Sequence, residues 1–322
     1  MGAATFFGTP RRALLTLAAL ALLAGVVFMT AGVRGNWGFV LGFRGTKLAV
    51  ICLVAHAIAM STVLFQTITG NRILTPSIMG FDALFRLVQT GLFYLFGTLF
   101  VTGLPPYALF AVQTVAMMLF AALLYGRLFT GSGASLHLML LVGIVLGTLF
   151  RALTTFLHGI IDPDAFLVLQ DQLFANFNRA SSPLLGTASA VILCASLAGL
   201  WQLRRFDVLA LGREQAVNLG LDHRRAVFGV LALISLLVSV STALVGPVTF
   251  FGLLVANLAY RLMPSHRHCH VLPAASLLAI ATLVGGQFAL ERIFSFGTAL
   301  SIIIEFAGGL LFLVLLLRGA TR

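Results

Sequence analysis

The stretch "LALGREQAVNLGLDHRRAV", Leu209–Val227, gathers charged side chains in the middle of a chain that is otherwise strongly apolar. The 322 residues are 60% hydrophobic and only 9% charged, and their mean hydropathy is +1.08. A water-soluble domain of this length does not have this composition. We therefore interpret the chain as a polytopic membrane protein, and the quoted stretch as a connection that faces water.

Apolar runs extend on both sides of this stretch and recur along almost the whole sequence. A helix that crosses the hydrocarbon core of a bilayer needs about 20 apolar residues. Runs of this length leave no room for a soluble domain, so we expect one all-α membrane domain, 1–322, with about ten spans. The expected spans are Ala13–Ala31, Leu48–Thr67, Phe81–Phe100, Tyr107–Leu128, Leu136–Leu157, Leu184–Leu203, Val227–Val245, Val248–Leu262, Val271–Leu290 and Ala299–Leu317.

The formal net charge of +11 would suggest a nucleic-acid partner in a soluble protein. In a membrane protein the positive-inside rule is the simpler explanation, and we expect no nucleic acid. If the amino terminus is cytoplasmic, most arginines fall on the inner side, which favours an even number of spans with both termini inside. Arg11 and Arg12 precede an apolar run that imitates a signal peptide, but its length predicts a retained first helix. The basic residues left on the outer side are Arg34, Arg44, Lys47, Arg179 and Arg292.

Several kinds of chemistry are missing from the sequence. No G-x-x-x-x-G-K-[ST] occurs, and the sole lysine, Lys47, lies in "GFRGTK", so any ATP must be hydrolysed by a partner. Only nine acids are present, and no catalytic constellation surrounds them, so we expect neither an enzyme nor a cofactor. The three cysteines imply no disulfide framework.

The quoted stretch itself predicts a short helix. Gly212 can begin and Gly220 can end about two turns, with Glu214 on one side and Ala216 on the other. From the residues alone, the stretch is either an ordinary polar loop or an element that docks on a soluble partner.

Four segments together resemble the membrane permease subunits of iron–siderophore and vitamin B12 ABC importers. The resemblance covers nearly the whole chain and keeps the family order of the motifs. It implies the type II ABC importer permease fold. The segments are "LALGREQAVNLGL" (209–221), "VSTALVGPVTFFGLLVANLAYRL" (240–262), "SHRHCHVLPAASLL" (265–278) and "GGLLFLVLLLR" (308–318).

The resemblance also implies partners and a role for the quoted stretch. In this family the region at about 205–225 forms short cytoplasmic helices that sit in a cleft of the ATPase. The expected assembly contains a second permease copy or paralogue, two ATPase subunits and a periplasmic binding protein that delivers a ferric siderophore. The residues expected to couple to the ATPase are Leu209, Leu211, Gly212, Arg213, Glu214, Ala216, Leu219 and Gly220.

"QTITGNRILTPSIMG", Gln66–Gly80, resembles the turn that follows the second span in the same family. With "FDALF" after it, the wording is closest to permeases for catecholate-containing siderophores such as petrobactin, anguibactin or vibriobactin. The plain alternative is a helix-breaking loop punctuated by Pro76 and Gly80.

The outer side carries basic residues in "GFRGTK" and "ALERIF". The resemblance implies that Arg44, Lys47 and Arg292 receive acidic residues of the periplasmic binding protein, where opposite charges would orient docking. The alternative is that these side chains only extend to the membrane interface.

A gate is expected at each side of the membrane. Asp162-Pro163 predicts a helix start, followed by apolar residues at helical spacing from Phe166 to Phe177. The family places a gating helix here, although a helix resting on the membrane surface fits the pattern equally. On the same family grounds, Ser132 and Ser135 would border the cytoplasmic gate.

Arg151 and Glu305 each interrupt an apolar span, and charge inside a membrane indicates function by default. We expect this pair to face the translocation pathway, either bonded together or with Arg151 offered to an anionic ferric chelate. An alternative function, a proton-coupled secondary transporter of about ten helices, would need titratable residues such as Glu305 and Asp82. A polytopic enzyme or assembly factor would need a catalytic cluster that the sequence lacks.

The cluster His266, His268, Cys269 and His270 resembles a metal site in composition, but its tight spacing suits tetrahedral coordination poorly, so we expect no metal. His56, one turn before Met60, could line a metal path, although helix packing is the simpler reading. Gly143 and Gly147, in "GIVLG", predict a close helix contact.

Overall fold

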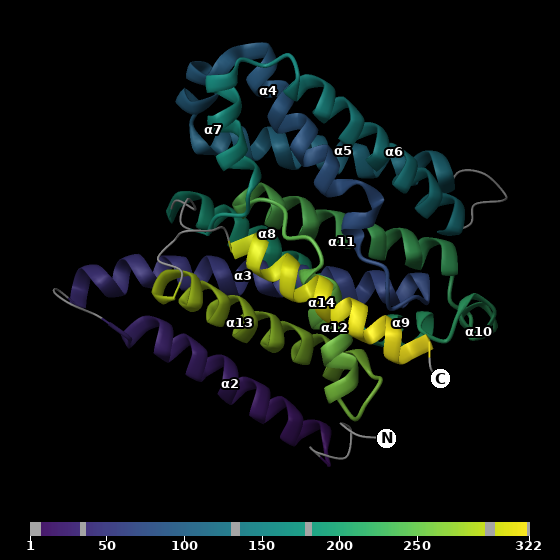
Figure 1. Ribbon diagram of the computed structural model, residues 1–322. Helices are drawn as coiled ribbons and strands as arrows, with labels where there is room; N and C mark the ends of the chain where they lie inside the picture. Colours follow the sequence, from purple (N-terminus) through teal and green to yellow (C-terminus); the bar gives the residue numbers. More distant parts are fainter. Residues whose placement is uncertain (1–7, 33–36, 130–135, 178–181, 294–299, 321–322) are drawn as a thin grey trace.

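A computed structural model describes residues 8–32, 37–129, 136–177, 182–293 and 300–320 of the chain. Helices make up nearly all of this part, and none of the described residues forms a strand, which confirms the all-α prediction (Figure 1). The elements are α2 (Pro10–Thr30), α3 (Trp37–Thr69), η1 (Pro76–Met79), α4 (Phe81–Gly103), α5 (Pro106–Phe129), α6 (Leu136–His158), α7 (Pro163–Leu173), α8 (Ser182–Leu200), α9 (Leu203–Leu209), α10 (Arg213–Asn218), α11 (His223–Val245), α12 (Phe251–Leu262), α13 (His268–Arg292) and α14 (Leu300–Ala320).

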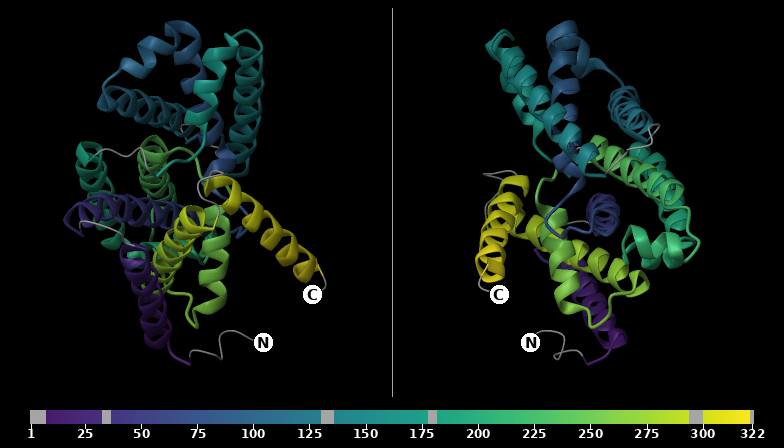
Figure 2. Two further views of the ribbon diagram at one scale, coloured as in Figure 1. Left: turned by 60° about the vertical axis from the view of Figure 1, so that its left-hand side comes forward. Right: turned by 90° about the vertical axis from the view of Figure 1, so that its right-hand side faces the viewer.

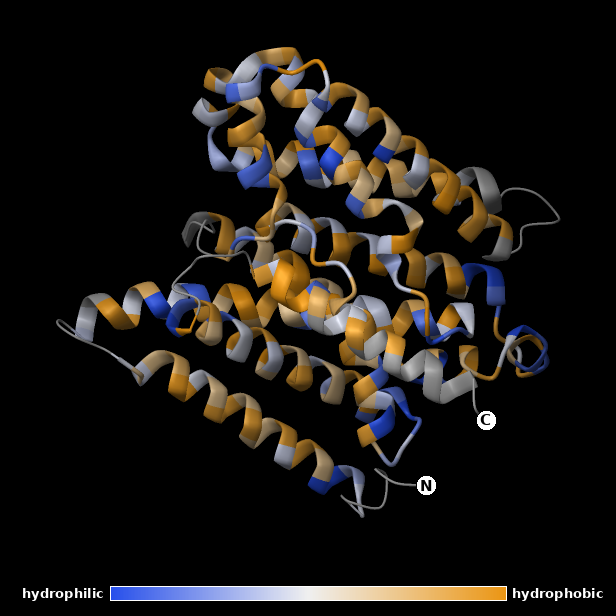
Figure 3. Ribbon diagram, in the orientation of Figure 1, coloured by the Kyte–Doolittle hydropathy of each residue, from blue (hydrophilic) through white to orange (hydrophobic). Residues whose placement is uncertain are grey.

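Ten of these elements correspond to the expected spans. In the described chain seven helices are long and apolar enough to cross a bilayer: α2, α3, α4, α5, α6, α11 and α13. The pair α8 and α9 qualifies as one bent span, and α12 and α14 are shorter apolar helices. Helices suit this environment because they satisfy their own backbone hydrogen bonds where no water can. Figure 3 shows apolar residues along most of their length.

Three boundaries differ from the prediction. Helix α3 begins at Trp37 rather than Leu48, because the polar side chains of its first turns find partners within the protein. The sixth span ends at Leu200, and the chain then bends by 64° into α9. The eighth span is the 12-residue α12, which begins after Phe250, a non-glycine residue with φ of 55°.

Helix α3 lies at the centre of the bundle and contacts α8, α11, α12 and α13. Helix α2 packs along α13 on one side, and α14 packs against α12 and α13. A second group, α4 to α7, lies above α11 in Figure 1 and remains a separate layer in both views of Figure 2. The bundle therefore has two layers that are joined mainly through α11, which contacts both α3 and α5.

The two layers also meet where η1 packs against α6. A Cβ atom added to Gly147 would lie 3.0 Å from Cα of Gly80, and one added to Gly143 would lie 3.1 Å from Cα of Met79. Gly80 adopts a left-handed conformation, φ of 93°, which turns the chain from η1 into α4. Gly143 and Gly147 therefore make the close helix contact that their spacing predicts.

His56, in the middle of α3, is held between two neighbouring helices. Its Nδ1 lies 2.8 Å from Oγ of Ser276 on α13, and its Nε2 lies 2.8 Å from Oγ of Ser196 on α8. Hydrogen bonds of this kind join helices inside a bilayer. The geometry favours the packing role over the metal path.

Candidate functional site

One end of the bundle carries a polar face formed by α9, α10, the start of α11 and the connection from α12 to α13. Figure 3 shows hydrophilic residues gathered there, at the end where α2 begins and α14 ends. Helix α10 contacts α9 and α11, and α9 in turn contacts α3 and α13. This face contains the segment that the sequence predicts to couple to an ATPase.

Helix α10 has the boundaries that its two glycines predict. Gly212 precedes it with φ of 94°, and Gly220 follows it with φ of 81°. The amide of Leu221 donates to the carbonyl of Ala216 at 3.0 Å, and the amide of Gly220 donates to that of Val217 at 2.9 Å. These two bonds form a Schellman cap, which needs a left-handed residue at Gly220.

The apolar side chains of this short helix mostly face away from the protein. Ala216 is buried, whereas Val217 is 53% exposed and Leu219 is 64% exposed. Leu211, just before the helix, is also exposed. Apolar side chains beside Arg213 and Glu214 on a water-facing end indicate a contact with another protein.

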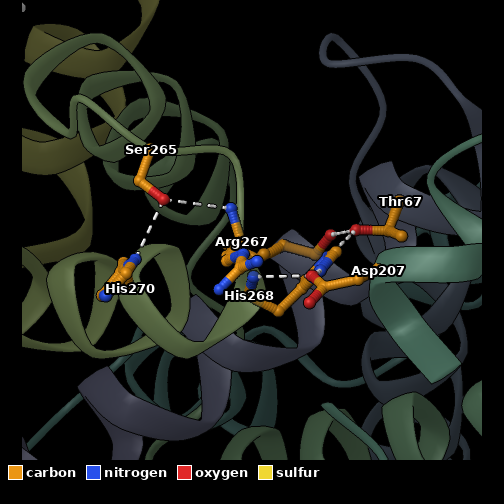
Figure 4. A network of polar contacts seen from close by, with 7 residues as sticks. Thr67, Asp207, Ser265, Arg267, His268 and His270 are labelled. Carbon is orange, nitrogen blue, oxygen red and sulfur yellow. Dashed lines mark hydrogen bonds and ion pairs between the residues drawn. The ribbon is translucent and has the colours of Figure 1, made fainter. Parts of the chain in front are cut away.

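A polar network fixes α9 to the bundle (Figure 4). Nδ1 of His268 lies 2.6 Å from Oδ1 of Asp207, and the backbone amide of His268 donates to the same oxygen at 2.8 Å. Nε2 of His268 lies 2.8 Å from Oγ1 of Thr67 at the end of α3. Since His268 is buried, α9 is tied rigidly to α3 and α13. Asp207 was not predicted as a site residue, because its partner lies 61 residues away.

The other members of the histidine cluster point to different partners. Nδ1 of His270 lies 2.9 Å from Oγ of Ser265, and His266 and Cys269 are exposed. Among the described residues no three His, Cys, Asp or Glu side chains come together in a way that could hold a metal. His268 turns inward to Asp207, so the sequence cluster does not converge.

At the opposite end, the three basic residues expected to dock a binding protein make bonds within the chain. Nη1 of Arg44 donates to the carbonyls of Phe28, Met29 and Ala31 at 3.0, 3.2 and 3.0 Å, which caps the end of α2. Nη2 of Arg292 donates to the carbonyl of Ala31 at 2.6 Å.

Lys47 is buried, and its Nζ lies 2.8 Å from Oε1 of Glu291. Arg292 remains exposed and Arg44 half-buried, so only these two are placed where a docking partner could contact them.

Arg151 and Glu305 do not meet. Nη2 of Arg151, an exposed residue on α6, lies 3.4 Å from Oγ1 of Thr148 in the preceding turn. Glu305 on α14 lies within electrostatic range of Asp82, the first acid of α4. No ion pair joins Arg151 to Glu305 in the described chain, so of the two predicted arrangements the structure favours an open Arg151. Ser132 and Ser135 lie outside the described residues.

The predicted outer helix is α7, and its start has the expected cap: Oδ1 of Asp162 accepts from the amide of Asp164 at 2.8 Å. The helix ends at Leu173, earlier than the apolar spacing suggested. A chain of buried amides holds it, in which Gln113 of α5 donates to Gln89 of α4 at 2.5 Å and Gln89 donates to Gln172 of α7 at 2.5 Å. Sequence reasoning missed this chain, because glutamines on three separate helices give no local pattern.

Ten apolar helices, a polar end with exposed coupling segments and charged residues on interior helices define a membrane permease. Comparison with known proteins places it more narrowly, because residues 13–318 match the FecCD transport family. The chain belongs to this family, whose members are transport permease subunits. It is therefore a multi-pass membrane protein.

Two curated relatives are similar over nearly their whole length. The petrobactin import system permease protein YclO of Bacillus subtilis is 45% identical over 305 residues, which cover 93% of this chain and 96% of that protein. The petrobactin import system permease protein FatC of Bacillus anthracis is 32% identical over 310 residues, covering 95% and 88%.

A solved structure shares the fold. It is described as an inward-facing conformation of an ABC transporter of metal-chelate type, with a TM-score of 0.84 at 22% identity. The alignment covers 96% of this chain and all of the other. The type II permease fold expected from the sequence is thereby confirmed.

Proposed function

We propose that the chain is the permease subunit of an ABC importer that moves a ferric siderophore of the catecholate type into the cytoplasm. Two relatives that are similar over most of their length are named as petrobactin import permeases, which supports this substrate class. The protein would lie in the bacterial inner membrane with both termini cytoplasmic, in agreement with the distribution of arginines.

The observation that carries this proposal is the exposed apolar surface of α10. Val217 and Leu219 face water at the polar end, and the segment is tied to the bundle through α9. A chain without a P-loop needs an energy source in another subunit. Two ATPase subunits, each contacting one permease copy or paralogue, would supply it by moving the coupling region.

Substrate would pass along α6 and α14. Arg151 is an exposed cation on an otherwise apolar helix, and the described chain places no acid against it. Such a group suits an anionic ferric chelate, and Glu305 would line the same passage. Ser132 and Ser135 would border the cytoplasmic gate, and Arg292 with Arg44 would meet the periplasmic binding protein.

The test is uptake of radioactive iron as ferric petrobactin in cells that carry Arg213→Glu or Glu214→Arg. We expect uptake and ATPase co-purification to be lost while the protein stays in the membrane. Arg12→Gln, at the exposed start of α2, is the matched control and should retain both. A ferric hydroxamate serves as the substrate control. Full uptake without any bound ATPase would overturn the proposal and favour a proton-coupled transporter.

A further inference from the structure

A cavity of about 1300 Å³ opens beside the coupling segment. Its walls come from the end of α3, the bend between α8 and α9, and the connection from α12 to α13. Ala210 and Leu211, which lead into α10, form part of the same wall. The cavity is therefore continuous with the surface proposed to meet the ATPase, although nothing in the coupling segment itself requires it.

Three arginines line this cavity, namely Arg72, Arg204 and Arg267, and all three are exposed. The guanidinium of Arg72 lies over the ring of Tyr260 at 4.6 Å, and within the described part of the chain neither Arg204 nor Arg267 forms an ion pair.

The one acid in the lining, Asp207, is already bonded to His268. The cavity thus presents several cations and no acid that is free to pair with them.

Trp201 adds a large apolar surface to the lining. It follows the last residue of α8 and is 88% exposed. Exposed tryptophan and arginine together are the side chains most often found at the energetic centre of a protein interface. The walls are also firmly placed, because the Asp207–His268–Thr67 contacts fix α9 against α3 and α13 (Figure 4).

We propose that this cavity receives an acidic side chain, Asp or Glu within an apolar segment, of the ATPase subunit. The inference rests on the proposed function and adds a second docking point to α10. A carboxylate would pair with the forks of Arg204 and Arg267, while the flanking apolar residues cover Trp201. Two separate contacts would stop the ATPase from pivoting on the short helix, and charge complementarity would orient it during encounter.

The chain offers a matched pair of variants. Arg204 and Arg205 are adjacent, exposed residues of α9, but only Arg204 lines the cavity. With purified permease in nanodiscs and the ATPase of the same importer, we expect Arg204→Glu to raise Kd by about tenfold or more, and Arg205→Glu by much less. Trp201→Ala should weaken binding in a way that added salt does not reproduce. Arg204→Gln replaces Arg204→Glu if the latter does not fold.

A second readout uses Cys269, an exposed cysteine in the lining. In a Cys194→Ala background, bound ATPase should slow maleimide labelling of Cys269 in wild type but much less in Arg204→Glu. Equal Kd values for Arg204→Glu and Arg205→Glu, with Cys269 unprotected, would overturn the inference.

Two further outcomes separate the inference from its neighbours. If Arg204→Glu leaves ATPase binding intact, and phosphatidylglycerol in the nanodisc stabilises wild type but not this variant, the occupant is a lipid headgroup and the inference is wrong. If wild-type permease binds no ATPase at all, the proposed function itself fails. Loss of binding in Glu214→Arg alone would retain the proposed function and exclude the cavity.

Discussion

Nζ of Lys47 lies 2.8 Å from Oε1 of Glu291, and the two side chains are only 6% and 14% exposed. Gln287 donates to the same carboxylate oxygen at 2.9 Å. The only lysine of the chain thus joins α3 to α13 close to the end of α2. This pair is a structural connection between helices, and it is not placed to receive a partner from outside.

Lys47→Met should destabilise the permease strongly. Removing one partner of a buried pair costs about 3–5 kcal/mol, because Glu291 keeps a charge without compensation. The measurement is Tm of the purified permease by fluorescence-monitored size exclusion. Lys47→Met/Glu291→Gln should recover much of the loss. A stable Lys47→Met variant that fails only in binding-protein docking would instead support the docking role predicted from the sequence.

Gly147→Ala should also lower Tm, because the new Cβ would lie 3.0 Å from the backbone of Gly80. Forcing an extra carbon into such a contact costs about 1–3 kcal/mol. Gly91→Ala on α4 is the control, since nothing lies within 4 Å of its Cβ position. Equal Tm values for both variants would contradict the close packing of α6 on the turn before α4.

Asp207→Ala should loosen the coupling segment without unfolding the bundle. It removes the acceptor for both the ring and the amide of His268, at a cost of about 1–3 kcal/mol. We expect faster hydrogen exchange in α9 and α10. Ser265→Ala removes only the partner of His270 and should leave α9 protected. If both variants exchange at the wild-type rate, the network does not fix α9.

Gln89→Leu should release α7, because it leaves both Gln113 and Gln172 without their shared partner. Local opening that becomes easier by about 1.4 kcal/mol speeds exchange about tenfold. Gln170→Leu, on the exposed side of α7, should leave exchange unchanged. Iron uptake followed alongside would show whether α7 acts as a gate. Unchanged exchange in Gln89→Leu would exclude the amide chain as its fastening.

Arg151→Ala should lower ferric petrobactin uptake while leaving the amount of membrane protein unchanged, because the removed cation is exposed and without an acid beside it. Arg151→Lys should retain part of the activity. Thr148→Val removes the hydrogen-bond partner of Arg151 and serves as the control for orientation alone. Normal uptake in Arg151→Ala and Glu305→Ala would show that the pathway role is wrong.

The apolar runs predicted ten helices correctly, because span length and hydrophobicity are local properties of the sequence. The glycines around α10 predicted its ends for the same reason, since positive φ is a local requirement. The end of α8 was misplaced at Leu203, because the 64° bend occurs within a continuous apolar run.

The partners of site residues could not be predicted. Lys47 was read as an exposed docking residue, and its true partner lies 244 residues further along the chain. The same limit applies to the cavity lined by Arg72, Arg204 and Arg267, because three distant segments must fold together before it exists.

The double cap on α2 has a consequence for the biogenesis of the protein. The carbonyl of Ala31 accepts from Arg44 of the next helix and from Arg292, which is synthesised 261 residues later. The first helix therefore enters the bilayer long before its final fastening leaves the ribosome. Until α13 inserts, the end of α2 is held by Arg44 alone, so the order of synthesis makes the ninth span the closing step of assembly at this end of the bundle.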